Sequence, residues 1–103
     1  MKREVIWTWA AEVDAQEAFV QMEEAVEGSG LHLIQLIDQL ILLLSGFPHM
    51  APVWHSPVRK AGLRKTKYGA FYVPESTRLV IIGVQDLRAA PDRLSRELKR
   101  RLP

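Results

Sequence analysis

The sequence predicts an α+β fold with the element order β-α-α-β-β-β-α. Three observations support this prediction: an alternating apolar segment near the N-terminus, two helical segments joined by glycines, and a C-terminal half in which short β-rich runs are separated by turn residues. A chain of 103 residues with 48% hydrophobic and 25% charged residues has the size and composition of one globular domain, so we expect a single domain over residues 1–103.

The first element is predicted as a strand from Glu4 to Trp9. Apolar side chains alternate along it, so that Val5, Trp7 and Trp9 share one face. Because tryptophan buries a large apolar area, we expect both tryptophans to anchor the core.

The next two elements are predicted as an antiparallel helical hairpin. Glycines in Gly28-Ser29-Gly30 end the first helix and leave only a short connection to the second, over 31–45. The first helix has an alanine-rich contact stripe, suited to close helix packing, made of Ala11, Ala15, Ala18, Phe19, Met22, Ala25 and Val26.

The second helix becomes apolar on every side from Leu40 to Leu44. The sheet covers part of this surface, and we expect the remainder, at Leu40, Leu43 and Leu44, to contact a partner or a second copy of the chain. The apolar stretch 31–44 is interrupted by polar residues and is shorter than a bilayer span, so we predict no membrane insertion.

A loop over 46–57, with prolines at 48, 52 and 57, precedes three predicted strands. These are a basic strand from Arg59, an aromatic strand over 68–73, and an apolar strand over 79–84 that is rich in β-branched residues. Turn residues at 74–77 join the last two strands into a hairpin. The segment Ala90-Pro91-Asp92 begins a short final helix, because proline and an acidic residue both favour the first helical turn.

Charge is unevenly distributed along the chain. Residues 1–54 carry two basic and eight acidic residues, a net −6, whereas residues 55–103 carry twelve basic and four acidic residues, a net +8. This asymmetry points to an acidic or polyanionic partner for the second half, although a solubilising surface explains it equally well.

Several chemistries have no support in the sequence. With no cysteine there is neither a disulfide framework nor a thiolate site, which is consistent with a reducing cytoplasm. The histidines at 32, 49 and 55 lack acidic companions at metal-ligand spacing, so we expect no metal and no cofactor. The start of the chain lacks the apolar core of a signal peptide.

In this order, the elements resemble the RelE/ParE superfamily of toxins from bacterial type II toxin–antitoxin systems. The likeness covers nearly the whole chain, and its motifs are specific only in combination. They are Ala11-Ala-Glu-Val-Asp14 at the first helix, Phe47-Pro48, Val58-Arg59, Tyr68-Gly-Ala-Phe-Tyr72, Leu79-Val-Ile-Ile-Gly-Val84 and Arg88-Ala-Ala-Pro91.

This resemblance implies either of two activities on one fold. RelE-like members cut mRNA in the ribosomal A site, whereas ParE-like members inhibit DNA gyrase, and a cognate antitoxin silences both. Nuclease members typically carry a tyrosine or histidine after the last strand, but residues 85–103 contain neither, and Gln85 stands where many relatives have histidine. The sequence therefore favours a ParE-like gyrase inhibitor. An RNA endonuclease, or a non-toxic relative that only binds a protein partner, remains the alternative.

We expect the sheet to present the charge that binds the antitoxin or the target. The predicted binding residues are Arg59, Arg64, Lys65, Lys67, Arg78 and Arg88, together with the apolar Leu40, Leu43 and Leu44. If the protein is a nuclease, the same six cations would stabilise the developing phosphorane charge, and Tyr72 is the candidate acid–base residue, although a structural role for that tyrosine is favoured.

Overall fold

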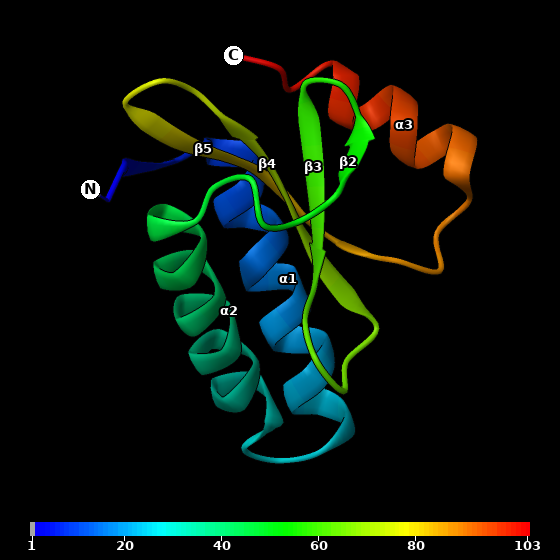
Figure 1. The fold of residues 1–103 in the computed structure, drawn as a ribbon. Helices are drawn as coiled ribbons and strands as arrows, with labels where there is room; N and C mark the ends of the chain where they lie inside the picture. Colours follow the sequence, from blue (N-terminus) through cyan, green and yellow to red (C-terminus); the bar gives the residue numbers. More distant parts are fainter. Residues whose placement is uncertain (1) are drawn as a thin grey trace.

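A computed structural model describes residues 2–103 and places five strands in one twisted sheet (Figure 1). The elements are β1 (Glu4–Trp7), α1 (Trp9–Ala25), α2 (Ser29–Gly46), β2 (Val53–His55), β3 (Val58–Gly62), β4 (Tyr68–Pro74), β5 (Arg78–Asp86) and α3 (Pro91–Lys99). The strand order is β1-β5-β4-β3-β2, in which β1 pairs with β5 in parallel and the other neighbours are antiparallel. The predicted α+β class and the order of its main elements are confirmed.

The helices lie on both faces of the sheet (Figure 1). On one face, α1 and α2 pack against a core cluster that includes Tyr72 and Ile81. On the other face, Leu94 and Leu98 of α3 pack against a second cluster that includes Phe71. A bulge in β5 between these clusters leaves Phe71 opposite Gly83 and Tyr72 opposite Ile81, so the two strands change register at that point.

The helical hairpin is held close by small residues. Ala11, Ala15 and Ala18 of α1 are buried. A Cβ atom at Gly30 of α2 would stand 2.8 Å from the carbonyl oxygen of Phe19, so only glycine allows this approach. Gly28 between the helices has φ +88°, a conformation in which glycine is favoured.

The prediction of a strand from Glu4 to Trp9 is wrong beyond Trp7. The hydroxyl oxygen of Thr8 accepts a hydrogen bond from the backbone N–H of Ala11 at 3.1 Å, which caps α1 and starts the helix at Trp9. Trp7 packs against the core as expected, but Trp9 is 79% exposed. The proline-rich loop also contains a strand that the sequence did not predict, the three-residue β2 at the sheet edge.

The 18-residue α2 is long and apolar enough to cross a membrane by length and composition, with a mean hydropathy of 1.3. This contradicts the expectation, drawn from residues 31–44 alone, that the segment is too short. The helix nevertheless supplies Leu33, Ile37, Ile41 and Leu44 to the core beneath the sheet, and such a core helix passes the same test.

Candidate functional site

Four of the predicted cations lie at one end of the sheet. Arg64, Lys65 and Lys67 belong to the turn between β3 and β4, and Arg88 follows β5. The two segments are joined because the backbone N–H of Leu87 donates to the carbonyl of Lys67 at 2.8 Å. We call Arg64, Lys65, Lys67 and Arg88 the basic turn.

Asp86 organises part of the basic turn. Its carboxylate lies 3.1 Å from Nη2 of Arg88 and 3.8 Å from Nζ of Lys67. The hydrogen bond from the Arg88 side chain is the main cause that holds the pKa of Asp86 below its ordinary value, and the same bond raises the pKa of Arg88. Arg64 and Lys65 are exposed and form no ion pair among residues 2–103, so they are the cations most available to a partner.

Arg59 does not belong to this surface. Its Nη1 donates to the carbonyls of Ala51 at 2.7 Å and His49 at 3.2 Å, which ties the proline-rich loop to β3. The Tyr72 hydroxyl donates to the carbonyl of Pro48 at 2.8 Å and holds the same loop. We predicted that Arg59 would present its charge to a partner. This is wrong, because its guanidinium is already hydrogen-bonded to the loop carbonyls.

Arg78 lies at the opposite end of the sheet. It starts β5 beside the turn that follows β4, and it pairs with Glu75 at 2.7 Å. Because β4 spans seven residues between the two turns, Arg78 is roughly 20 Å from the basic turn. The sheet therefore does not gather the six predicted binding cations on one surface: Arg59 and Arg78 lie apart from the other four, since strand register rather than sequence proximity sets their positions.

The three predicted apolar contact residues, Leu40, Leu43 and Leu44, differ in how exposed their side chains are. Leu44 is 0% exposed and packs in the core, so its prediction as a contact residue is wrong. Leu40 is half-buried, and Leu43 is 45% exposed. These two line a small hollow of about 200 Å³ against the end of β3, beside Arg64.

Neither tyrosine is placed as an exposed acid–base group. Tyr72 is 0% exposed, and burial is the main cause that raises the pKa of its hydroxyl. Burial also raises the pKa of Tyr68, whose hydroxyl donates to Oε1 of Gln21 at 2.6 Å. Both hydroxyls thus remain protonated at neutral pH and already have a partner.

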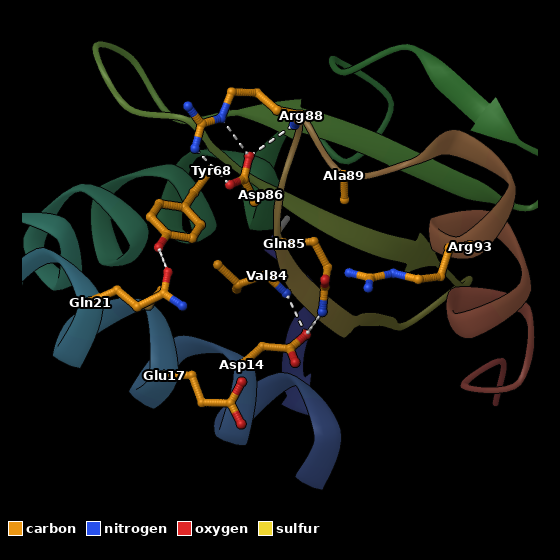
Figure 2. A pocket seen from close by; sticks show the side chains of 11 residues that line it. Asp14, Glu17, Gln21, Tyr68, Val84, Gln85, Asp86, Arg88, Ala89 and Arg93 are labelled. Atoms are coloured by element: carbon orange, nitrogen blue, oxygen red, sulfur yellow. Dashed lines mark hydrogen bonds and ion pairs between the residues drawn. The ribbon is translucent and has the colours of Figure 1, made fainter.

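Tyr68 borders a cleft of about 580 Å³ between α1, the end of β5 and the segment leading into α3 (Figure 2). Asp14 lies in its wall and is a residue that sequence reasoning missed. Oδ2 of this carboxylate accepts hydrogen bonds from the backbone N–H of Val84 at 3.0 Å and from Nε2 of Gln85 at 2.8 Å. Gln85 thus helps to hold the Asp14 carboxylate in place.

Arg101 completes this group from beyond α3. Its guanidinium forms an ion pair with Asp14 at 2.5 Å and also donates to the carbonyl of Ile82 at 3.0 Å. Burial is the largest single influence on the pKa of Arg101 and would lower it, but the hydrogen bond to Asp14 and the negative charges of Asp14 and Glu97 together outweigh burial, so the pKa is raised. A signal was present in the sequence, because Asp14 is the one charged residue among the alanines of the buried α1 face. We call Asp14, Gln85 and Arg101 the buried anchor.

Among residues 2–103, no group of three or more His, Cys, Asp or Glu side chains is arranged to hold a metal ion. The exposed guanidinium and ammonium groups of the basic turn can instead bind phosphates or carboxylates by charge and hydrogen bonding.

The fold has a clear counterpart among solved structures. A chain of the structure described as "Chromosomal ParDE TA system from P. aeruginosa" superposes with a TM-score of 0.72 at 16% sequence identity, over 82% of this chain and 96% of that chain. No protein-family model matches the sequence, and no curated protein does. The protein therefore has a ParE-like fold. The resemblance to the RelE/ParE superfamily, first indicated by the order of the elements, is confirmed at the level of the fold.

Proposed function

We propose that the protein is the single-domain toxin of a bacterial type II toxin–antitoxin pair, acting in the cytoplasm and neutralised by a cognate antitoxin. The observation that carries this proposal is the ParE-like fold, shared over most of both chains with a component of a ParDE toxin–antitoxin system. Because one fold can host several activities, the choice of target has to come from the residues of the site.

We infer that the target is DNA gyrase. Cutting RNA at the 2′-hydroxyl requires a base and an acid that exchange protons near neutral pH. The hydroxyls of Tyr68 and Tyr72 are buried and already hydrogen-bonded, and Gln85 cannot exchange a proton there. A protein that binds and inhibits its target needs no such groups, and the basic turn supplies exposed charge for binding.

Two experiments test the proposal in sequence. Expression from an inducible promoter is expected to arrest growth, and coexpression of the cognate antitoxin is expected to restore it. Purified protein is then added to a gyrase supercoiling assay and to a defined translation mixture. Loss of supercoiling with intact mRNA supports the gyrase inhibitor. Cleavage of ribosome-bound mRNA would instead assign the RelE-like activity, and absence of growth arrest would favour a non-toxic binding protein.

A further inference from the structure

A pocket on the helical hairpin has no part in the site described above. Its volume is about 410 Å³, and it is lined by Trp7 of β1, by one face of α1 from Glu12 to Phe19, and by one face of α2 from Ile34 to Asp38. No residue lines both this pocket and the cleft that Asp14 borders. The two helices lie side by side on the face of the sheet opposite α3 (Figure 1). We call this space the hairpin pocket.

The interior of the hairpin pocket is apolar. Ile37 and Ala15, which are 2% and 9% exposed, are the most buried of its lining residues. Trp7, Phe19 and Ile34 are half-buried, so part of each apolar side chain remains open to a ligand. Because the side chain of Ala15 ends at Cβ, it leaves space between these larger neighbours. The volume falls within the range of about 300–1,000 Å³ that is typical of sites for small organic molecules.

One end of the hairpin pocket carries two carboxylates. The hairpin brings Gly30 against Phe19, where a Cβ atom on the glycine would meet the Phe19 carbonyl oxygen. The helices run antiparallel from that contact, and Asp38 lies eight residues after Gly30, whereas Glu12 lies seven residues before Phe19. Glu12 and Asp38 therefore lie at the same level of the hairpin. Trp7 is at this level too, because it comes just before α1, and Phe19 lies toward the other end.

The charge at this end has no counterpart within the pocket. Glu12 and Asp38 are exposed and form no ion pair among residues 2–103, and none of those residues that line the pocket is lysine, arginine or histidine. Trp7 adds an aromatic ring, whose negative face attracts cations. The pocket thus combines an apolar interior with an end that favours positive charge.

We propose that the hairpin pocket binds a small organic amine. Its protonated nitrogen would lie between Glu12 and Asp38, and its ring or aliphatic body would pack on Phe19 and Ile34. Attraction to two carboxylates and to the Trp7 ring holds the nitrogen, and burial of the apolar body supplies further affinity. The α1 wall spans seven residue steps, or roughly 10 Å, between two aromatic side chains. These limits suit a compact molecule rather than an extended segment of a partner protein.

This proposal concerns the acidic half of the chain, to which the toxin assignment gives no task. Residues 1–54 carry a net −6, whereas the basic turn belongs to the half with a net +8. Acidic residues can serve solubility alone, but solubility does not require a partly open apolar interior beside them. The inference goes beyond the proposed function and does not rest on it, since the pocket is defined by its own residues.

A titration with three small molecules of similar shape and different charge tests the proposal on the purified full-length chain. Tryptamine carries a protonated amine, N-acetyltryptamine is neutral, and indole-3-propionate is an anion. Binding is followed by NMR through the indole N–H signals of the three tryptophans, and Trp7→Phe identifies the signal of Trp7. We expect tryptamine to shift that signal saturably, the neutral analogue to bind at least about fivefold more weakly, and the anion to give no saturable shift.

Neutral variants of the two carboxylates separate this pocket from the general acidity of the surface. Glu12→Gln combined with Asp38→Asn should weaken tryptamine binding at least about fivefold and remove the preference for the amine over its neutral analogue. Glu24→Gln combined with Glu27→Gln is the matched control, because it neutralises two exposed carboxylates of the same hairpin outside the pocket. It should change the affinity less than about twofold, since salt screens distant exposed charges. Circular dichroism checks that each variant is folded.

The proposal is overturned if tryptamine leaves the Trp7 signal unshifted, if the anion binds as tightly as the amine, or if the neutral variant keeps its preference for the amine. A shift confined to Trp9 or Trp54 would also overturn it, because the amine would then bind elsewhere. Sedimentation velocity at the same concentration detects self-association, and a dimer that covers Trp7 and excludes tryptamine would assign the pocket to a second copy instead. None of these readouts involves growth arrest, so failure of either proposal can be told from failure of the other.

Discussion

Two carboxylate–guanidinium pairs in this protein perform opposite tasks. In the buried anchor, Asp14 and Arg101 have side chains only 7% and 13% exposed, and they connect α1, β5 and the end of the chain. In the basic turn, Asp86 and Arg88 are 31% and 70% exposed, and they lie at the end of the sheet. Burial makes the first pair part of the fold, whereas water screens the second pair and weakens its contribution to stability.

The same comparison explains why charge alone is a poor guide to the site. Arg59, Arg78 and Arg101 add as much to the net charge as Arg64 does. The first is bound to loop carbonyls, and the other two are bound to carboxylates within the fold. Only cationic side chains that form no ion pair or hydrogen bond within the fold can contribute their full charge to binding a partner. The following predictions test this division, from the largest expected effect on the free energy of unfolding to the smallest.

Asp14→Asn should be the most damaging single change. It leaves the Arg101 guanidinium buried beside a neutral amide, a situation that costs about 3–5 kcal/mol. Asp86→Asn is the matched control and should cost less than about 1 kcal/mol, because water screens the exposed pair. Urea unfolding followed by tryptophan fluorescence measures both. Equal losses in the two variants would contradict the distinction between anchor and turn.

Gly83→Ala should disturb the anchor from the sheet side. A Cβ atom there would lie 2.8 Å from Cδ2 of Leu98 and 3.1 Å from Nη1 of Arg101, so α3 and the anchor would have to shift. We expect a loss of about 1–3 kcal/mol in the free energy of unfolding. Gly46→Ala serves as the control, since its Cβ would meet nothing within 4 Å and its stability should change by less than about 0.5 kcal/mol.

Tyr72→Phe should loosen the proline-rich loop and leave the sheet intact. The change removes the hydrogen bond to the carbonyl of Pro48 and costs about 1–2 kcal/mol, because that carbonyl loses its buried donor. Hydrogen exchange should accelerate in residues 47–52, while amides in β4 and β5 stay protected. If the protein were a nuclease that used this hydroxyl, activity would fall far more than stability.

Lowering the pH should remove a small contribution of the basic turn to the free energy of unfolding. The pKa of Asp86 is lowered in the folded state, so its contribution is complete above the ordinary carboxyl pKa of 3.8 and is lost as the pH falls through the lower folded value. The difference in unfolding free energy between the wild type and Asp86→Asn should therefore shrink below about pH 4, from a starting value under about 1 kcal/mol. A difference that grows with acid would have the wrong sign for this pair.

Much of the fold could be predicted because it depends on local patterns. The β-branched run of β5, the glycine that ends the first helix and the proline in the first turn of α3 all act over a few residues. The errors arise where local signals compete or where distant segments meet. Thr8 both continues an alternating pattern and caps a helix, and the cap determined the structure at Trp9.

The candidate site was harder to predict, because contacts between distant segments determine which of its residues come together and which are exposed. Arg59 and Arg64 are five residues apart, yet one is fixed by the 49–51 loop and the other is exposed in a turn. The buried anchor joins residues 87 positions apart, and no pattern in the sequence connects Asp14 with Arg101. Leu44 differs from Leu43 only by its direction on α2, which depends on where the sheet lies.

The most direct test of the account is a gyrase supercoiling titration with the purified wild type and with an Arg64→Glu, Lys65→Glu double variant. Both residues are exposed, so the variant should unfold within about 0.5 kcal/mol of the wild type. We predict that the wild type inhibits supercoiling and that the double variant inhibits at least about tenfold more weakly, because reversed charge opposes binding. Equal inhibition by the two proteins would remove the basic turn from the mechanism, and no inhibition by the wild type would contradict the gyrase assignment.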